Sequence, residues 1–189
     1  MALRLTLVSH AATGALKKAR FAADEPIEID GESDEKLNVC VGRRTRFIHG
    51  PELRTRQTAA LFSQVSQPDD ALRDYDFGRW KGCALDEIAR DQQDALTHWM
   101  TDWQAAPHGG ESVEQLFHRV RLWMDGLTGD GHVVAITHPF ILRAALMRVL
   151  QCPPSAFHSI DVEPMSAVDL RFNGIWRMRL VSPTGPMAS

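Results

Sequence analysis

Short apolar segments alternate with longer amphipathic segments along this chain, and this alternation constrains its fold more than any other feature. Buried strands are predicted at residues 3–8, 45–49 and 132–137, and helices at 52–65, 85–103, 112–127 and 140–150. Such an order gives parallel strands with helices on both faces of the sheet. Residues 167–172 and 175–181 flank an Asn-Gly turn and predict a hairpin. We therefore expect an α/β fold, a three-layer α/β/α sandwich with a mostly parallel sheet and a C-terminal antiparallel hairpin.

Length and composition predict one domain over residues 1–182, followed by a flexible tail at 183–189. The formal charge of -3 argues against a partner as acidic as nucleic acid or an anionic membrane. The N-terminus does not resemble a signal peptide, and no apolar stretch is long enough to cross a bilayer. Three widely spaced cysteines suit a reducing compartment better than disulfides or a zinc site. We therefore expect a cytoplasmic protein.

Two histidines follow two of the predicted strands directly. His10 comes after the strand at 3–8, and His138 comes after the strand at 132–137. Ligands of open α/β sheets bind outside the carboxyl ends of the strands. One histidine at such a place is most simply a buried or surface residue, but two can converge on one crevice. The sequence therefore favours a functional site built around His10 and His138.

Six segments of the chain, taken in order, resemble the motifs of one family. Residues 7–13 read L-V-S-H-A-A-T and resemble the L-V-R-H-G-E-T signature of the histidine phosphatase (phosphoglycerate mutase-like) superfamily. The other similar segments are D-E-P-I at 24–27 with Gly31, G-P-E-L-R-T-R-Q-T-A at 50–59, L-R-D-Y-D-F-G-R-W-K-G at 72–82, G-G-E-S at 109–112 and T-H-P-F at 137–140. Several motifs in the right order are specific, whereas any one alone is not. The chain resembles the short phosphatase branch of that family.

The resemblance implies a hydrolase, less often a mutase, that acts on a small phosphomonoester without a metal or another cofactor. His10 would attack phosphorus and form a phosphohistidine, since a neutral imidazole is nucleophilic near neutral pH. Arg54 and protonated His138 would stabilise the transferred anionic group, and Ser9 and Thr13 could each donate a hydrogen bond to it.

The leaving oxygen needs a proton, which the family takes from a carboxylic acid in the L-x-E motif. Asp74 stands at that position here and is one methylene shorter than glutamate. Asp76 and Glu111 are the alternative donors. The resemblance favours Asp74 and leaves the other two open.

Three departures from the family pattern surround the predicted site. Ser9 replaces the phosphate-binding arginine, Leu16 stands where an asparagine is common, and Pro139 removes an N–H group beside His138. Loss of one preorganised donor costs about 100- to 1000-fold in rate. Two interpretations follow: an active phosphatase, or a catalytically impaired phosphatase-like domain that binds or regulates. In either case we expect the partner to be a small phosphorylated metabolite and not nucleic acid or a membrane. The sequence leaves open whether the chain forms a homodimer.

Overall fold

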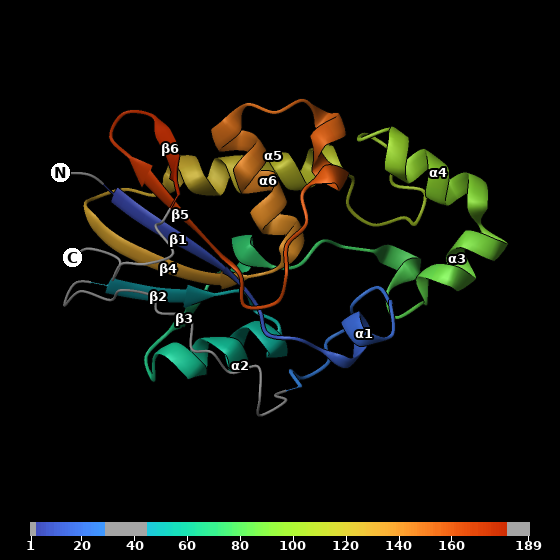
Figure 1. Ribbon diagram of the computed structural model, residues 1–189, viewed down its shortest axis with the longest axis horizontal. Helices are drawn as coiled ribbons and strands as arrows, with labels where there is room; N and C mark the ends of the chain where they lie inside the picture. The colour runs from blue at the N-terminus through green and yellow to red at the C-terminus, as the bar shows by residue number, and fades with distance from the viewer. Residues whose placement is uncertain (1–2, 29–44, 181–189) are drawn as a thin grey trace.

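One six-stranded sheet forms the centre of the molecule in the computed structural model, which describes residues 3–28 and 45–180 (Figure 1). Its strand order is β3-β2-β4-β1-β5-β6. The strands are β1 Leu3–Ser9, β2 Thr45–His49, β3 Gln67–Pro68, β4 Gly131–Thr137, β5 Ala167–Phe172 and β6 Trp176–Arg179. Strands β1 to β4 pair in parallel, whereas β5 pairs antiparallel with both β1 and β6. The mostly parallel sheet with a C-terminal antiparallel pair is confirmed. The tail predicted at 183–189 lies outside the described residues.

Helices cover both faces of this sheet, as the apolar pattern of the strands requires. They are α2 Leu53–Phe62 on one face, and α5 Val113–Gly126 and α6 Pro139–Leu150 on the other. Within β1, Leu5 and Leu7 belong to the large core that includes α5 and α6, whereas Val8 packs in a smaller cluster with Ala59 of α2. Alternate residues of a strand point to opposite faces, so β1 packs against the helices of both layers. None of the described helices is long and apolar enough to span a membrane.

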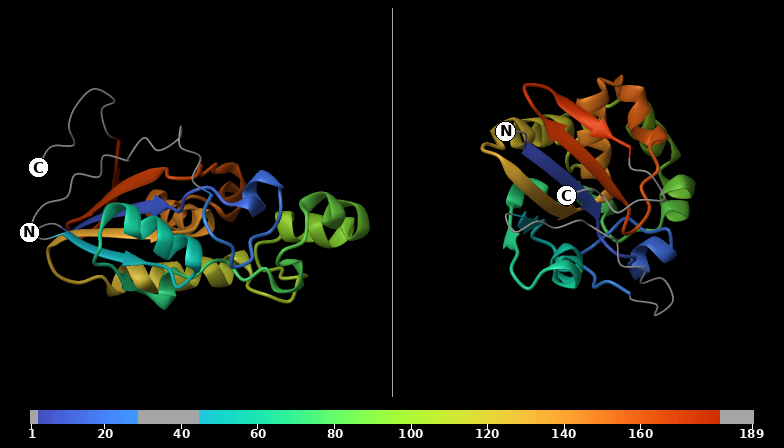
Figure 2. Two further views of the ribbon diagram at one scale, coloured as in Figure 1. Left: turned by 90° about the horizontal axis from the view of Figure 1, so that it is seen from below. Right: turned by 60° about the vertical axis from the view of Figure 1, so that its left-hand side comes forward.

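The short helices lie beyond the carboxyl end of the sheet. They are α1 Gly14–Lys17, α3 Leu85–Asp91 and α4 Gln93–Thr101, and Figures 1 and 2 show α3 and α4 at the far end of the molecule. The prediction of one helix over 85–103 is wrong, because the backbone leaves helical geometry at Gln92 (φ -139°, ψ 39°). The side-chain oxygen of Gln92 accepts a hydrogen bond from the Trp80 indole at 3.0 Å, a contact that holds the break in place.

The turn of the C-terminal hairpin also differs from expectation. Phe172 pairs with Trp176, so Asn173, Gly174 and Ile175 form a three-residue loop rather than a two-residue turn. A two-residue Asn-Gly turn of type I′ needs positive φ at both central residues. Only Gly174 has one, at 98°. Ile175 therefore belongs to the turn and not to the strand.

Candidate functional site

The two strand-end histidines lie side by side. Strands β1 and β4 are parallel neighbours, and Ser9 is in register with Thr137, so the next residue of each strand is a histidine at the same edge. The ring centroids of His10 and His138 are 5.2 Å apart with the rings edge to face. The parallel register therefore brings together two residues that are 128 positions apart in the sequence (138 minus 10).

The His10 ring is held in one orientation and in the neutral form. Its Nδ1 lies 2.8 Å from the carbonyl oxygen of Ala11, and an acceptor there requires a proton on Nδ1. The lone pair is then on Nε2, the nitrogen free to react. Burial, together with the charges of His138 and Arg54, lowers the pKa of His10 from 6.5 to about 4, although the Ala11 hydrogen bond acts in the opposite direction. The His10 imidazole is thus neutral over a wide range of pH.

A cavity of about 160 Å³ opens in front of His10. Ser9, Thr13 and Asp74 line it together with His10. Most of the remaining wall is apolar and comes from Ala15, Leu16, Phe21, Ala22, Phe77, Pro139, Phe140, Val162 and Pro164, with Arg20 as the other charged side chain among the described lining residues. The arrangement fits a ligand that has one compact anionic group and an apolar body.

Asp74 connects this cavity to two buried side chains, Arg54 and His138. Its Oδ2 accepts a hydrogen bond from Arg54 and lies 3.5 Å from Nδ1 of His138. Arg54 is 1% exposed and His138 is completely buried. Burial alone would raise the pKa of Asp74, but the charges of His138 and then Arg54 outweigh it and hold the pKa below its ordinary value. Neither Arg54 nor His138 is among the described lining residues of the cavity, and both contact Asp74, which is.

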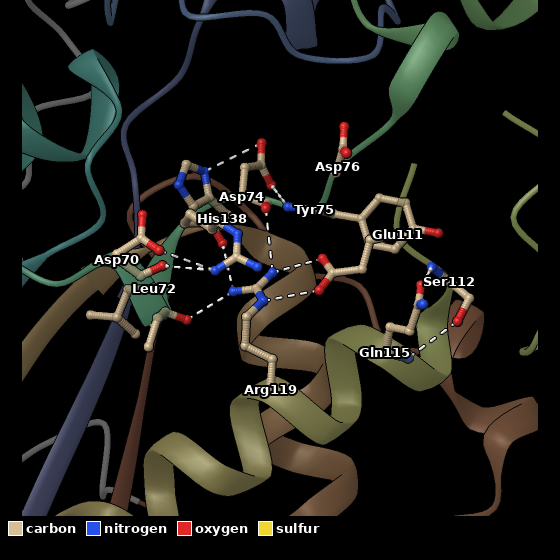
Figure 3. A network of polar contacts seen from close by, with 12 residues as sticks. Asp70, Leu72, Asp74, Tyr75, Asp76, Glu111, Ser112, Gln115, Arg119 and His138 are labelled. Carbon is tan, nitrogen blue, oxygen red and sulfur yellow. Dashed lines mark hydrogen bonds and ion pairs between the residues drawn. The ribbon is translucent and has the colours of Figure 1, made fainter. Parts of the chain in front are cut away.

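The alternative carboxylates face a different space. Asp76 and Glu111 line a separate open groove of about 1010 Å³ between α5 and the loop before Gly78, and His10 is not among its lining residues. Figure 3 shows Glu111 turned towards Arg119, whereas Asp74 is turned towards His138. Of the three candidate carboxylates, only Asp74 lines the His10 cavity.

Three buried polar atoms in this region have no hydrogen-bond partner. They are Oγ of Ser9, Nε of Arg54 and Nδ1 of His138. Thr13, by contrast, donates to Glu25 at 3.3 Å and accepts from the backbone of Leu16 at 3.5 Å, as the N-cap of α1. A buried polar atom without a partner costs free energy unless a ligand satisfies it. Ser9, Arg54 and His138 thus each have a polar atom that could bond to a ligand, whereas the Thr13 hydroxyl already has hydrogen-bond partners.

Arg119 of α5 is a structural residue of the site that sequence reasoning missed. Its guanidinium forms two hydrogen bonds with the Glu111 carboxylate, at 2.9 and 2.7 Å, and donates to the carbonyl oxygens of Ala71 and Arg73 at 2.8 and 3.1 Å (Figure 3). These bonds fix the loop that carries Asp74. A charged residue beside Leu116 and Val120, on the apolar face of an amphipathic helix, was the available signal.

Glu52 is the second residue that the sequence did not reveal. It is the N-cap residue of α2, yet its side chain makes no capping bond to the helix. Instead Oε2 lies 2.8 Å from Nε2 of His138, and Oε1 accepts the backbone N–H of Asp74 at 2.9 Å. Although burial acts to raise the pKa of Glu52, the hydrogen bond and charge of His138 lower it to about 2. Glu52 therefore contacts both His138 and Asp74 without lining the His10 cavity itself.

Comparison with known proteins agrees with this architecture. Residues 6–181 match the histidine phosphatase superfamily (branch 1). A bifunctional protein of Mycobacterium tuberculosis is 28% identical over 198 residues, which cover 96% of this chain and 54% of that protein. The chain thus spans about half the length of the curated relatives it matches.

Solved structures share the fold at low sequence identity. The α-ribazole phosphatase from Shigella flexneri superposes with a TM-score of 0.79 at 19% identity, covering 94% of this chain and 95% of that one. A mycobacterial glucosyl-3-phosphoglycerate phosphatase superposes with a TM-score of 0.77 at 22% identity, covering 94% and 97%. With its neighbouring strand-end histidines and a family match over nearly its whole length, the chain belongs to the histidine phosphatase superfamily.

Proposed function

We propose that this chain is a metal-independent phosphatase that hydrolyses a small phosphomonoester through a phosphohistidine on His10. One observation carries the proposal: a neutral His10, fixed through Nδ1, faces a cavity beside buried donors that have no partner. A nucleophile needs its lone pair aimed at phosphorus, and the phosphoryl group needs positive charge around it. Arg54 and His138 supply that charge.

In the first step, Nε2 of His10 attacks phosphorus, a P–N bond forms and the bond from phosphorus to the leaving oxygen breaks. Asp74 donates the proton that the leaving oxygen takes up. In the free protein the charges of His138 and Arg54 keep the pKa of Asp74 low. A bound phosphate dianion offsets those charges, so that burial, which raises the pKa, dominates and Asp74 can bind a proton. In the second step water attacks phosphorus, the P–N bond breaks, and Asp74 receives the proton from water.

The walls of the cavity restrict the substrate. A space of about 160 Å³ with mostly apolar walls favours an uncharged, apolar group next to the phosphate. A cavity of about 150 Å³ is large enough for a benzene ring. We therefore expect aryl or short alkyl phosphates to be better substrates than compounds with a second phosphate.

The test is hydrolysis of para-nitrophenyl phosphate and of an alkyl phosphate, with and without EDTA. We expect activity in EDTA and none in His10→Ala. Asp74→Asn should slow the alkyl ester more than the aryl ester, because a good leaving group needs little proton donation. Strict metal dependence, or full activity in His10→Ala, would contradict the mechanism.

Ser9 favours a second candidate, a phosphatase-like domain that binds a phosphorylated metabolite without turnover. Its hydroxyl is uncharged and stands where the family motif has an arginine. Calorimetry with vanadate separates the two candidates. Binding of vanadate without hydrolysis of any ester would support the binding domain, and hydrolysis abolished by His10→Ala would support the enzyme.

A further inference from the structure

Residues 50–59 resemble the pattern S-P-L-x-R-A-x-Q-T-A of the histidine phosphatases, and Gly50 and Glu52 are two of the positions where they differ from it. Glu52 stands at the leucine of that pattern and Gly50 at its serine. A Cβ atom at position 50 would lie 3.0 Å from Oε2 of Glu52 and 3.1 Å from Nε2 of His138. Both distances are shorter than ordinary van der Waals contacts. The absence of a side chain at Gly50 thus leaves room for the Glu52 carboxylate against the His138 ring.

The Glu52 carboxylate fixes two site residues at once. By accepting from Nε2 of His138 at 2.8 Å, it determines which edge of the ring faces Asp74. By accepting the backbone N–H of Asp74 at 2.9 Å, it fixes the position of the Asp74 backbone. His138 is completely buried and the Glu52 side chain is only 19% exposed. A carboxylate partner of this kind sets the orientation of a histidine ring.

We propose that Glu52 is a positioning residue that holds His138 with Nδ1 towards the reacting phosphoryl group, and that Gly50 is required for this contact. The inference rests on the proposed phosphatase function for its kinetic consequence. It does not rest on that function for the contact itself. Glu52 touches neither the His10 cavity nor a reacting atom among the residues described, so it acts through His138 and Asp74.

The first test compares Glu52→Gln, Glu52→Leu and Glu52→Asp with a control in the same region. Asp24→Asn is that control, because Asp24 accepts the N–H of Leu53 at 2.8 Å and supports the start of α2 without touching His138. We expect kcat to fall about 10- to 100-fold in Glu52→Gln and Glu52→Leu, the usual cost of losing an orienting partner. KM should change less, Glu52→Asp should recover part of kcat, and Asp24→Asn should stay near the wild-type value.

A second test measures the coupling with Gly50. Gly50→Ala is made alone, with Glu52→Ala, and in the double variant. The alanine methyl group also approaches the Leu72 carbonyl oxygen at 2.8 Å, but that cost is common to both backgrounds and cancels in the cycle. We expect Gly50→Ala to lower kcat clearly when Glu52 is present and much less when it is absent. Additive effects would overturn the role assigned to Gly50.

The third readout does not depend on activity. In the ¹H–¹⁵N spectrum of the histidine rings, the Nε2–H of His138 should exchange slowly in the wild type and in Asp24→Asn, and be lost in Glu52→Leu. If no ester is hydrolysed, the function proposed above fails and this spectrum alone decides the contact. A His138 signal unchanged in Glu52→Leu, or kcat within twofold of wild type in both Glu52→Gln and Glu52→Leu, would overturn the inference.

Discussion

Two arginine–carboxylate pairs, Arg54 with Asp74 and Arg119 with Glu111, contact the same loop and differ in how completely their hydrogen bonds are satisfied. Arg119 uses all three of its nitrogens, in two bonds to Glu111 and further bonds to backbone carbonyl oxygens. Arg54 donates to the Ala23 carbonyl oxygen and to Asp74, while its Nε has no partner.

The difference distinguishes a structural arginine from one that is available to a ligand. A saturated guanidinium gains nothing from an anion and loses bonds if it moves, so Arg119 keeps the loop in place. Arg54 has a spare donor and pairs with the one carboxylate that lines the His10 cavity. Under the proposed function, an entering phosphoryl group would pair with Arg54 and release Asp74 for proton transfer. The two arginines therefore differ in whether every nitrogen already has a hydrogen-bond partner.

Exchanging each arginine for methionine gives the largest expected effects and tests the comparison directly. Arg119→Met removes the bonds that hold the loop and leaves the partly buried Glu111 without its partner, so it should lower the free energy of unfolding by about 1–3 kcal/mol. Arg54→Met should cost less stability, because Asp74 keeps its hydrogen bond from the Tyr75 N–H and its proximity to His138. It should instead lower kcat about 100- to 1000-fold.

Urea unfolding and initial rates, measured below the transition of each variant, check both halves of this prediction. Arg121→Met on the same helix is the control, since the only bond seen for its guanidinium within the described residues is an exposed contact of 3.5 Å to His118. Equal losses of stability in Arg54→Met and Arg119→Met would remove the distinction.

The next effect in size concerns the donor that Ser9 does not provide. Ser9→Arg places a permanent charge at the edge of the cavity and should raise the rate on a simple aryl phosphate by about 10- to 1000-fold, the reverse of losing one donor. Ser9→Lys adds the same charge without the planar fork, so its gain should be smaller. Initial rates on the aryl ester compare the three proteins. A lower rate in Ser9→Arg would show that Ser9 is fitted to the natural substrate.

The smallest effect is the dependence of stability on pH. The pKa of His10 is 6.5 in an unfolded chain and about 4 in the folded protein, mainly because of burial. Between these values the unfolded chain binds a proton that the native state does not. The contribution of neutral His10 to stability is therefore complete above pH 6.5 and is lost as the pH falls towards 4, with a slope of up to about 1.4 kcal/mol per pH unit. Urea titrations across this range should show a smaller slope in His10→Gln than in the wild type. Equal slopes would contradict the assignment.

The sequence was sufficient for features that depend on local periodicity. The strands before His10 and His138 follow from short apolar runs, and the parallel register then brings the two rings together. Contacts between distant residues were not predictable in the same way. Glu52 and His138 are 86 positions apart, and the contacts of Arg119 with the Asp74 loop span 45 to 48 positions. The helix break at Gln92 likewise needs a partner, Trp80, that lies outside the helix.

The strand that carries His10 lies inside the sheet, and its last residues are held from both sides. The His10 N–H donates to the Thr137 carbonyl oxygen at 2.9 Å on the β4 side, while the Ser9 N–H donates to that of Ser166 at 2.9 Å on the β5 side. Much of the cavity wall instead comes from the short helix α1 and from connecting segments, including Leu16 of α1 and the loop residues Phe21 and Val162. Loops tolerate exchange far better than central strands. A lineage with this architecture can therefore diversify in what it recognises while the reactive nitrogen stays in place, and libraries confined to these loops are the natural route to new specificities.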